Sequence, residues 1–93
     1  MIIGLLELEL RFPEAQSLKD KRMVLRSLSD RIRNKFNVSV AEVDGGDAHH
    51  HGTMGVAHVS NEQKFSNQVL SQIVNLVERE RDVELVDYQL SFM

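Results

Sequence analysis

The sequence has no cysteine, no tryptophan and only one proline. The absence of cysteine excludes disulfides, thiol catalysis and thiolate metal sites, and it is compatible with a reducing compartment. Long apolar runs are absent as well: no basic region precedes the short segment Ile2–Leu6, and Glu7 and Glu9 interrupt its continuation. We therefore expect neither a signal peptide nor a membrane span, and a cytoplasmic location.

The 93 residues are 42% hydrophobic and 27% charged, a balance typical of globular rather than disordered chains. A chain of this length forms one domain, so we expect residues 1–93 to make a single folded unit with a modest core. A chain with so small a core gains stability when it buries a further apolar surface, which favours a homodimer.

The formal charge of −3 hides an uneven distribution. Between Arg11 and Lys35, eight Lys or Arg residues stand against three acids, a net of +5, so the remainder of the chain carries −8. The overall charge would repel a polyanion weakly, whereas the basic segment would attract one within a Debye length of roughly 8 Å in physiological salt. Any binding to nucleic acid should therefore be local and salt-sensitive.

The basic segment also contains a clear helix signal, from Ser17 to Phe36. Ser17 can cap the helix, and Asp20, three residues later, can complete a capping box with it. The negative charge of Asp20 also suits the positive end of the helix dipole. An apolar stripe at helical spacing predicts the face that packs against a sheet. Its members are Leu18, Leu25, Leu28, Ile32 and Phe36.

Four basic residues of this helix fall within roughly 60° of one another, counted at about 100° per residue. This basic row lies beside the apolar stripe and consists of Lys19, Arg22, Arg26 and Arg33. Two interpretations stay open: a solvated face, or a docking surface for phosphates or an acidic protein. Lys21 points into the apolar stripe, where it must extend to the surface or find a carboxylate. We expect a structural ion pair there, but keep Lys21 among the binding candidates.

Strands and a second helix account for the rest of the chain. Period-two alternation from Gly4 onward predicts a strand over residues 2–10. Further strands are expected over residues 38–43, 53–59 and 83–92. The glycines and aspartates between Asp44 and Gly52 predict a long hairpin loop. Ser60, followed three positions later by Gln63, predicts the cap of the second helix. Its inward face is expected to consist of Phe65, Val69, Ile73, Leu76 and Val77.

The order β-α-β-β-α-β predicts an α+β fold of the ferredoxin-like, split βαβ type. In this fold a four-stranded antiparallel sheet of strand order 4-1-3-2 carries two helices on one face, and right-handed crossovers leave few alternatives. The other face of the sheet must be exposed to solvent, bind a ligand or pair with a second copy of the chain. Ile3 and Leu5 share that face with Glu7 and Glu9, and the expected homodimer forms there.

Three segments of the sequence carry a resemblance to known proteins. They are Ser17–Arg22 (SLKDKR), Lys35–Val43 (KFNVSVAEV) and Gly55–Asn61 (GVAHVSN). Together they resemble the YlxP-like family of small bacterial proteins, and the similarity spans nearly the whole chain. The resemblance implies a ferredoxin-like fold, a cytoplasmic location and no catalytic motif. It also suggests a setting in translation or ribosome maturation, because genes of the family often lie beside those of translation and ribosome-binding factors. In the hairpin loop, relatives usually show an aromatic and then a Gln-Arg-like pair, whereas this chain has Ala48 and three histidines.

RNA-binding domains of this strand order usually stack bases on aromatic residues of the two central strands. The expected central strands, residues 2–10 and 53–59, contain no aromatic residue, and Glu7 and Glu9 would repel phosphate. Contact with RNA should therefore come from the basic row, through backbone phosphates. We expect a non-enzymatic module that docks on structured RNA or a ribosomal particle. The alternative is an assembly subunit that binds an acidic protein.

The hairpin loop holds the weak candidates for metal ligands, Asp47, His49, His50 and His51. Carboxylate and imidazole suit a divalent metal, which leaves a metal-dependent enzyme as a remote alternative. Adjacent histidines should splay apart on an extended chain, and three glycines should leave the loop loose, so we expect no physiological metal site and no cofactor. Without a nucleophile elbow or a phosphate loop, we also expect no enzymatic activity.

Overall fold

The alternation at the start of the chain produces a strand that is buried on one side. In the computed structural model, which describes residues 1–93, β1 (Ile2–Arg11) buries Leu6, Leu8 and Leu10. β1 pairs antiparallel with β3 (His51–Ser60) on one side and with β4 (Glu84–Phe92) on the other. β2 (Ser39–Asp44) pairs with β3 and completes the order β2-β3-β1-β4. This is the predicted order 4-1-3-2, read from the opposite edge.

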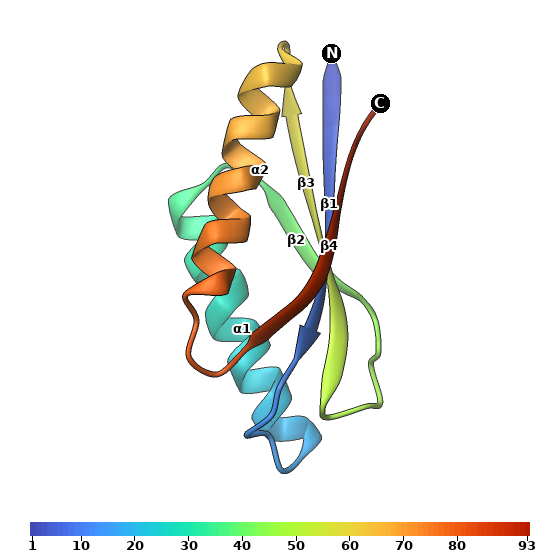
Figure 1. Ribbon diagram of the computed structural model, residues 1–93, viewed down its shortest axis with the longest axis vertical. Coiled ribbons are helices and arrows are strands. Elements are labelled where there is room, and N and C mark those ends of the chain that lie inside the picture. The colour runs from blue at the N-terminus through green and yellow to red at the C-terminus, as the bar shows by residue number, and fades with distance from the viewer.

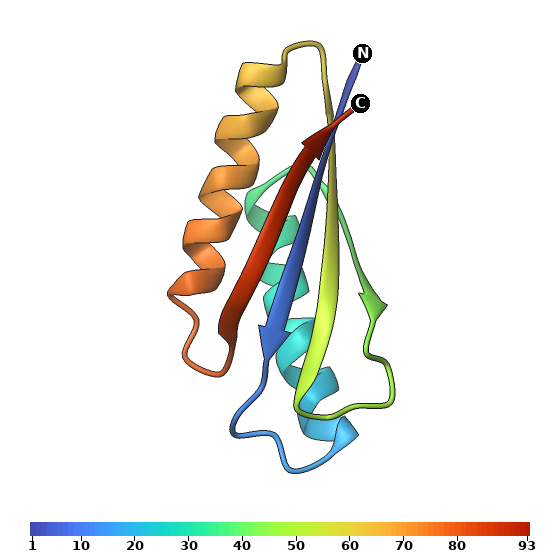
Figure 2. The ribbon, with the colours of Figure 1, turned by 45° about the vertical axis from the view of Figure 1, so that its right-hand side comes forward.

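The two helices cover the same face of this sheet. α1 (Leu18–Lys35) and α2 (Gln63–Glu78) lie together on one side of the strands in Figure 1. In Figure 2 the four strands lie side by side with α1 behind them. The two chain ends meet at one end of the sheet, and the connection between β2 and β3 lies at the other. The prediction of an α+β, ferredoxin-like fold is confirmed.

One hydrophobic core fills the layer between sheet and helices. Both helices bury a single apolar stripe, because residues three and four apart lie on one side of a helix. The core residues of the sheet are Leu6, Leu8, Leu10, Val40, Met54 and Val56, and those of the helices are Leu25, Leu28, Ile32, Leu70, Ile73, Val74 and Val77. The connections contribute Phe12, Ala15 and Val83.

α1 begins at the predicted cap. The Oγ atom of Ser17 accepts the backbone N–H of Asp20 at 3.1 Å. The carboxylate of Asp20 accepts the N–H of Gln16 at 3.0 Å in return. Two backbone donors near the helix start are therefore satisfied by side chains rather than by water.

The start of α2 differs from the prediction. The helix begins at Gln63 after Glu62, whose side chain makes no capping hydrogen bond. Ser60 is not the cap, because its hydroxyl belongs to the turn that follows β3, where it donates to the carbonyl oxygen of Glu62 at 2.8 Å. A serine three residues before the first helical residue satisfies a local turn here, which is a common alternative for a short hydroxyl side chain.

The buried face of α2 agrees with the prediction at Ile73 and Val77, which are fully buried, but not at Phe65, which is 50% exposed. Ser66, Leu70 and Val74, which were not predicted, are buried as well. Leu70, Ile73 and Val77 define this face of the helix, and Ser66 lies on the same side. The hydroxyl of Ser66 hydrogen-bonds there to the buried ring of His58 on β3.

The face of the sheet opposite the helices is open. A shallow hollow crosses it, with a floor of small residues such as Gly55 and Ala57 and with Leu5 and Val43 beside them. The polar side chains of this face include Glu7, which also borders the hollow. No helix of the protein is both long enough and apolar enough to cross a membrane.

The cap of α1 can be tested with Ser17→Ala. We expect a loss of about 1 kcal/mol in the free energy of unfolding, because the N–H of Asp20 loses its acceptor. Urea denaturation followed by circular dichroism measures the change. Ser27→Ala, at an exposed position within α1, is the matched control and should leave stability unchanged or slightly raised. Equal effects of the two substitutions would contradict the capping role.

The homodimer remains a prediction, and the open face is the surface to test. Light scattering should give twice the chain mass of 10.6 kDa, and Leu5→Lys should shift the population toward the monomer. Asn67→Lys, at an exposed position on α2, adds the same charge on the other face and should leave the mass unchanged. A monomer across a wide concentration range would rule out the dimer.

Candidate nucleic-acid interface

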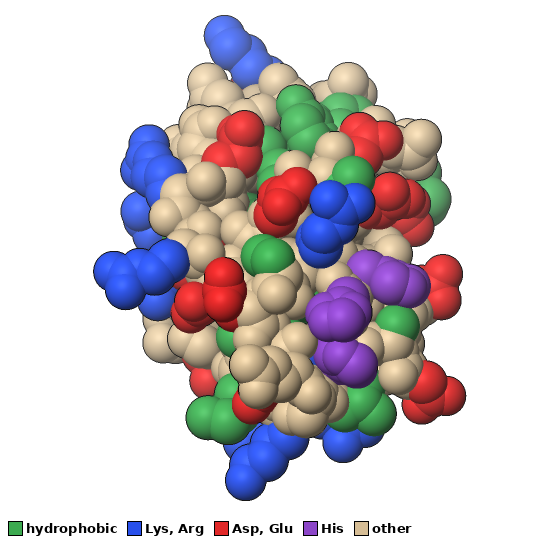
Figure 3. Space-filling view, turned by 60° about the horizontal axis from the view of Figure 1, so that its bottom comes forward, with side chains coloured by type: hydrophobic (Ala, Val, Ile, Leu, Met, Phe, Trp, Pro, Cys, Tyr) green, Lys and Arg blue, Asp and Glu red, His purple; other side chains and the backbone are tan.

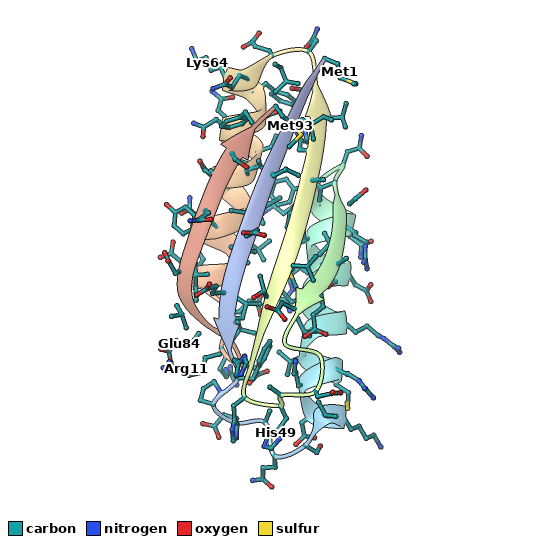
Figure 4. The ribbon with its side chains drawn as sticks, turned by 90° about the vertical axis from the view of Figure 1, so that its right-hand side faces the viewer. Met1, Arg11, His49, Lys64, Glu84 and Met93 are labelled. Atoms are coloured by element: carbon teal, nitrogen blue, oxygen red, sulfur yellow. The ribbon has the colours of Figure 1, made fainter.

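Helical spacing brings most of the basic row to one exposed side of α1. Lys19, Arg22 and Arg26 are exposed, and none of them takes part in an ion pair of the structure. Figure 4 views the open face of the sheet and shows nitrogen-tipped side chains that project from α1 beyond the edge formed by β2. Lys19, Arg22 and Arg26 are therefore three exposed cations of α1 that are available to a ligand.

Arg33, at the far end of the basic row, is held by the protein itself. Its Nη2 atom donates to the carbonyl oxygen of Val40 at 2.7 Å, and its Nη1 atom lies 3.5 Å from the carboxylate of Asp30. Val40 belongs to β2, an edge strand, whose outer backbone groups have no neighbouring strand. The guanidinium therefore covers part of an edge that would otherwise be open to pairing with another chain.

Lys21 lies beneath the surface, apart from the basic row. Its side chain is 1% exposed, and its Nζ atom donates to the carbonyl oxygens of Gly45 at 2.5 Å and Ala48 at 2.6 Å. The same ammonium lies 2.8 Å from Oε2 of Glu42. The expectation of a structural ion pair is confirmed. With three acceptors for three N–H bonds, this ammonium is not presented to a partner.

Two glycines make room for this contact. A Cβ atom at Gly52 would lie 2.8 Å from Oε2 of Glu42 and 3.3 Å from Cε of Lys21, so a larger residue would displace the ion pair. Gly45 has φ +84°, in the left-handed region that glycine adopts without strain. The two glycines let the chain bring its carbonyls within reach of the ammonium.

The sequence suggested that the connection between β2 and β3 is loose. The structure instead shows hydrogen bonds that hold it. Lys21 holds it at Gly45 and Ala48, and the N–H of Phe12 donates to the carbonyl oxygen of His50 at 2.8 Å. These hydrogen bonds come from two other parts of the chain, α1 and the segment after β1. The three glycines had indicated flexibility only because their long-range partners were not visible in the sequence.

The histidines of this connection also lie differently from the prediction. The rings of His49 and His50 do not splay apart: their centroids are 4.1 Å apart, and their planes are tilted by 58°. Figure 3 shows histidine side chains gathered at one end of the molecule. No group of three or more histidine, aspartate or glutamate side chains is arranged to hold a metal ion, so the structure does not bring Asp47 and His51 together with this pair as ligands.

A buried polar chain at the opposite end of β3 was missed. Nδ1 of His58 lies 2.8 Å from Oγ of Ser66, which lies 2.7 Å from Oγ of Ser60. Because Ser60 gives its single proton to Glu62, Ser66 must donate to Ser60 and His58 must donate to Ser66. Ser66 is fully buried, so this chain stabilises the junction of β3 and α2 rather than exposing a nucleophile. The available signal was a serine on the apolar side of a helix.

Comparison with known proteins places the chain in a family. Residues 3–90 match the family described as "Protein of unknown function (DUF503)". The "Uncharacterized protein YlxP" of Bacillus subtilis (strain 168) is 32% identical over 83 residues, which are 89% of this chain and 90% of that protein. The resemblance to YlxP-like proteins is confirmed. Neither description names a ligand or a reaction, so the function has to be argued from the geometry.

The ammonium of Lys21 can be tested against a neighbour on the same helix. Lys21→Met should lower the free energy of unfolding by about 3 kcal/mol, because two carbonyls and a partly buried carboxylate lose their donor. Lys19→Met removes an exposed, unpaired cation and should change stability by no more than about 0.5 kcal/mol. Urea denaturation measures both. Similar small effects of the two substitutions would show that the buried contact is unimportant.

Proposed function

This chain belongs to the DUF503 family, and for this member we propose a non-enzymatic binding module of the cytoplasm. It docks on structured RNA, such as that of a ribosomal particle, through Lys19, Arg22 and Arg26. The observation that carries the proposal is that three unpaired cations share one exposed side of a helix in a protein of net charge −3. The suggested setting in translation rests on the resemblance to YlxP-like proteins.

The spacing of the three cations suits a phosphate backbone. Lys19 and Arg26 are seven residues apart, which is about 10 Å along a helix. A strand of duplex DNA presents a charge about every 3.4 Å of its axis, and RNA likewise carries one charge per nucleotide, so the helix could meet about three phosphates. Contacts of this kind position a protein on RNA without reading its sequence.

The open face of the sheet is a poorer candidate for RNA. Glu9 and Asp87 are register partners of β1 and β4, and Glu7 lies two residues away on the same side of β1. These carboxylates would repel phosphate. The central strands β1 and β3 contain no Phe, Tyr or Trp on which bases could stack. The basic side of α1 therefore fits a polyanion better than the sheet does.

The test is charge reversal at the three exposed cations, Lys19→Glu, Arg22→Glu and Arg26→Glu, in one variant. Arg33 and Lys21 are left intact because their substitution would disturb β2 and its connection. Co-sedimentation of the untagged protein with purified small and large ribosomal subunits, over a salt series, measures affinity. We expect at least a tenfold loss at low salt. The slope of log affinity against log salt should become shallower by about 2 to 3, since each phosphate contact contributes about 0.7 to 0.9.

A matched variant separates a local site from overall charge. Lys64→Glu, Arg79→Glu and Arg81→Glu change the net charge equally at exposed positions on and after α2, and this variant should keep most of the affinity. An equal loss in both variants, or no binding of the wild-type protein at low salt, would refute the proposal. Binding that survives nuclease treatment but fails in the α1 variant would replace RNA with an acidic protein partner.

A further inference from the structure

The outer edge of β4 carries backbone hydrogen-bonding groups that no neighbouring strand uses. Ile3 and Met93 exchange both of their backbone hydrogen bonds, at 2.9 and 3.0 Å, so they form a hydrogen-bonded pair of the antiparallel ladder. Such pairs alternate with pairs whose backbone groups point away from the partner strand. In the register of β1 and β4, the outward groups on β4 therefore belong to Tyr88, Leu90 and Phe92.

Asp87 occupies one of these outward groups. The N–H of Tyr88 donates to Oδ1 of Asp87 at 2.8 Å, which places a carboxylate at the edge of the sheet. Asp87 is exposed and takes part in no ion pair, and its register partner on β1 is Glu9, a second unpaired carboxylate. A strand that approaches this edge has to displace Asp87 before it can use the N–H of Tyr88. Charged side chains at sheet edges limit unspecific pairing in this way.

The other edge of the sheet is less suited to receive a strand. β2 has six residues, and its register with β3 shifts between Glu42 and Asp44. Arg33 already donates to the carbonyl oxygen of Val40 there. On β4, in contrast, the register is unbroken from Asp87 to Phe92, and Figure 4 shows this strand along the opposite edge. A further strand would therefore pair with β4.

The side chains of β4 specify the kind of strand that fits. Tyr88 is the register partner of the core residue Leu8, so its side chain lies on the helix side of the sheet, where it is 46% exposed. A neighbouring strand gains most there from an apolar side chain. On the open side, Asp87 and Glu9 favour a cation. Because successive side chains of a strand point to opposite faces, alternating apolar and basic residues satisfy both sides.

We propose that the edge of β4 binds an extended segment of a partner protein, in which lysine or arginine alternates with apolar residues, as a further antiparallel strand. A cation of the segment attracts the carboxylate of Asp87, and the N–H of Tyr88 becomes available to a carbonyl oxygen of the incoming strand. An acidic segment leaves Asp87 on that N–H. Asp87 is thus the residue that determines specificity. This surface is separate from the cations of α1, and the inference does not depend on RNA docking.

Fluorescence anisotropy with short labelled peptides tests the specificity. One peptide alternates lysine with valine, and a second carries glutamate in place of lysine. We expect the wild-type protein to bind the lysine peptide about tenfold more tightly, because attraction to Asp87 and Glu9 becomes repulsion. Asp87→Asn keeps an acceptor for the N–H of Tyr88 without the charge, and it should lose most of this preference. Asp47→Asn removes the same charge at an exposed position between β2 and β3 and should keep the preference.

N-methylated peptides separate strand addition from simple charge attraction. In an antiparallel hydrogen-bonded pair, the residue opposite Tyr88 bonds through its own N–H and carbonyl groups. Methylation of the valine nitrogens therefore removes the donors that face β4 and should abolish binding. Methylation of the lysine nitrogens removes donors that face away from β4 and should be tolerated.

Hydrogen exchange followed by NMR locates the contact. The amide protons of Leu90 and Phe92 should exchange quickly in the protein alone and slowly when the lysine peptide is bound. Circular dichroism confirms that the Asp87 variant is folded.

Four results would overturn the inference. They are absence of binding of the lysine peptide, equal affinity for the lysine and glutamate peptides, retained affinity after valine methylation, and unchanged exchange at Leu90 and Phe92. Protection of these two amides in the protein alone would also overturn it, because a second copy of the chain would then occupy the edge. The binding of ribosomal subunits is measured separately, so failure here leaves the docking proposal standing.

Discussion

A lysine ammonium that is removed from water must find an acceptor for each of its three N–H bonds, since an unpaired buried charge costs several kcal/mol. Lys21 finds these acceptors in Glu42 and in the carbonyls of Gly45 and Ala48. The three acceptors come from β2 and from the connection that follows it, and Gly52 on β3 leaves the space that they need. One side chain thereby determines how α1, an edge strand and the connection between β2 and β3 fit together.

The same contact decides which cations remain on the surface. Because Lys21 faces the sheet, Lys19, Arg22 and Arg26 must face away from its acceptors. Arg33 makes a second contact with β2, at the other end of α1, through the carbonyl oxygen of Val40. Lys21 and Arg33 thus join α1 to the sheet. Lys19, Arg22 and Arg26 form the surface that we assign to a polyanion.

The connection between β2 and β3 shows how a contact distant in sequence changes the meaning of a local pattern. Glycines and aspartates next to histidines indicate a mobile loop when only local propensities are considered. In the folded protein, hydrogen bonds from Lys21 and Phe12 hold this segment in one conformation. The rings of His49 and His50 lie beside each other on this segment, and no group of three or more possible metal ligands forms there.

The amino-acid sequence by itself determined the fold class, the strand order, the cap at Ser17 and the membership of the basic row. These depend on periods of 2 and 3.6 residues and on side chains that act within one turn, so the necessary information lies within a short window. Only the tertiary structure decided the burial of Ser66 on α2, the hydrogen bonds that hold the histidine segment and the removal of Arg33 from the free cations. Each of these depends on a polar contact between elements: His58 with Ser66, Lys21 with Ala48, and Arg33 with Val40. Hydrophobic periodicity identifies which side of a segment is buried, but a hydrogen bond between segments depends on the distance and direction of two particular groups, which exist only after the elements have packed.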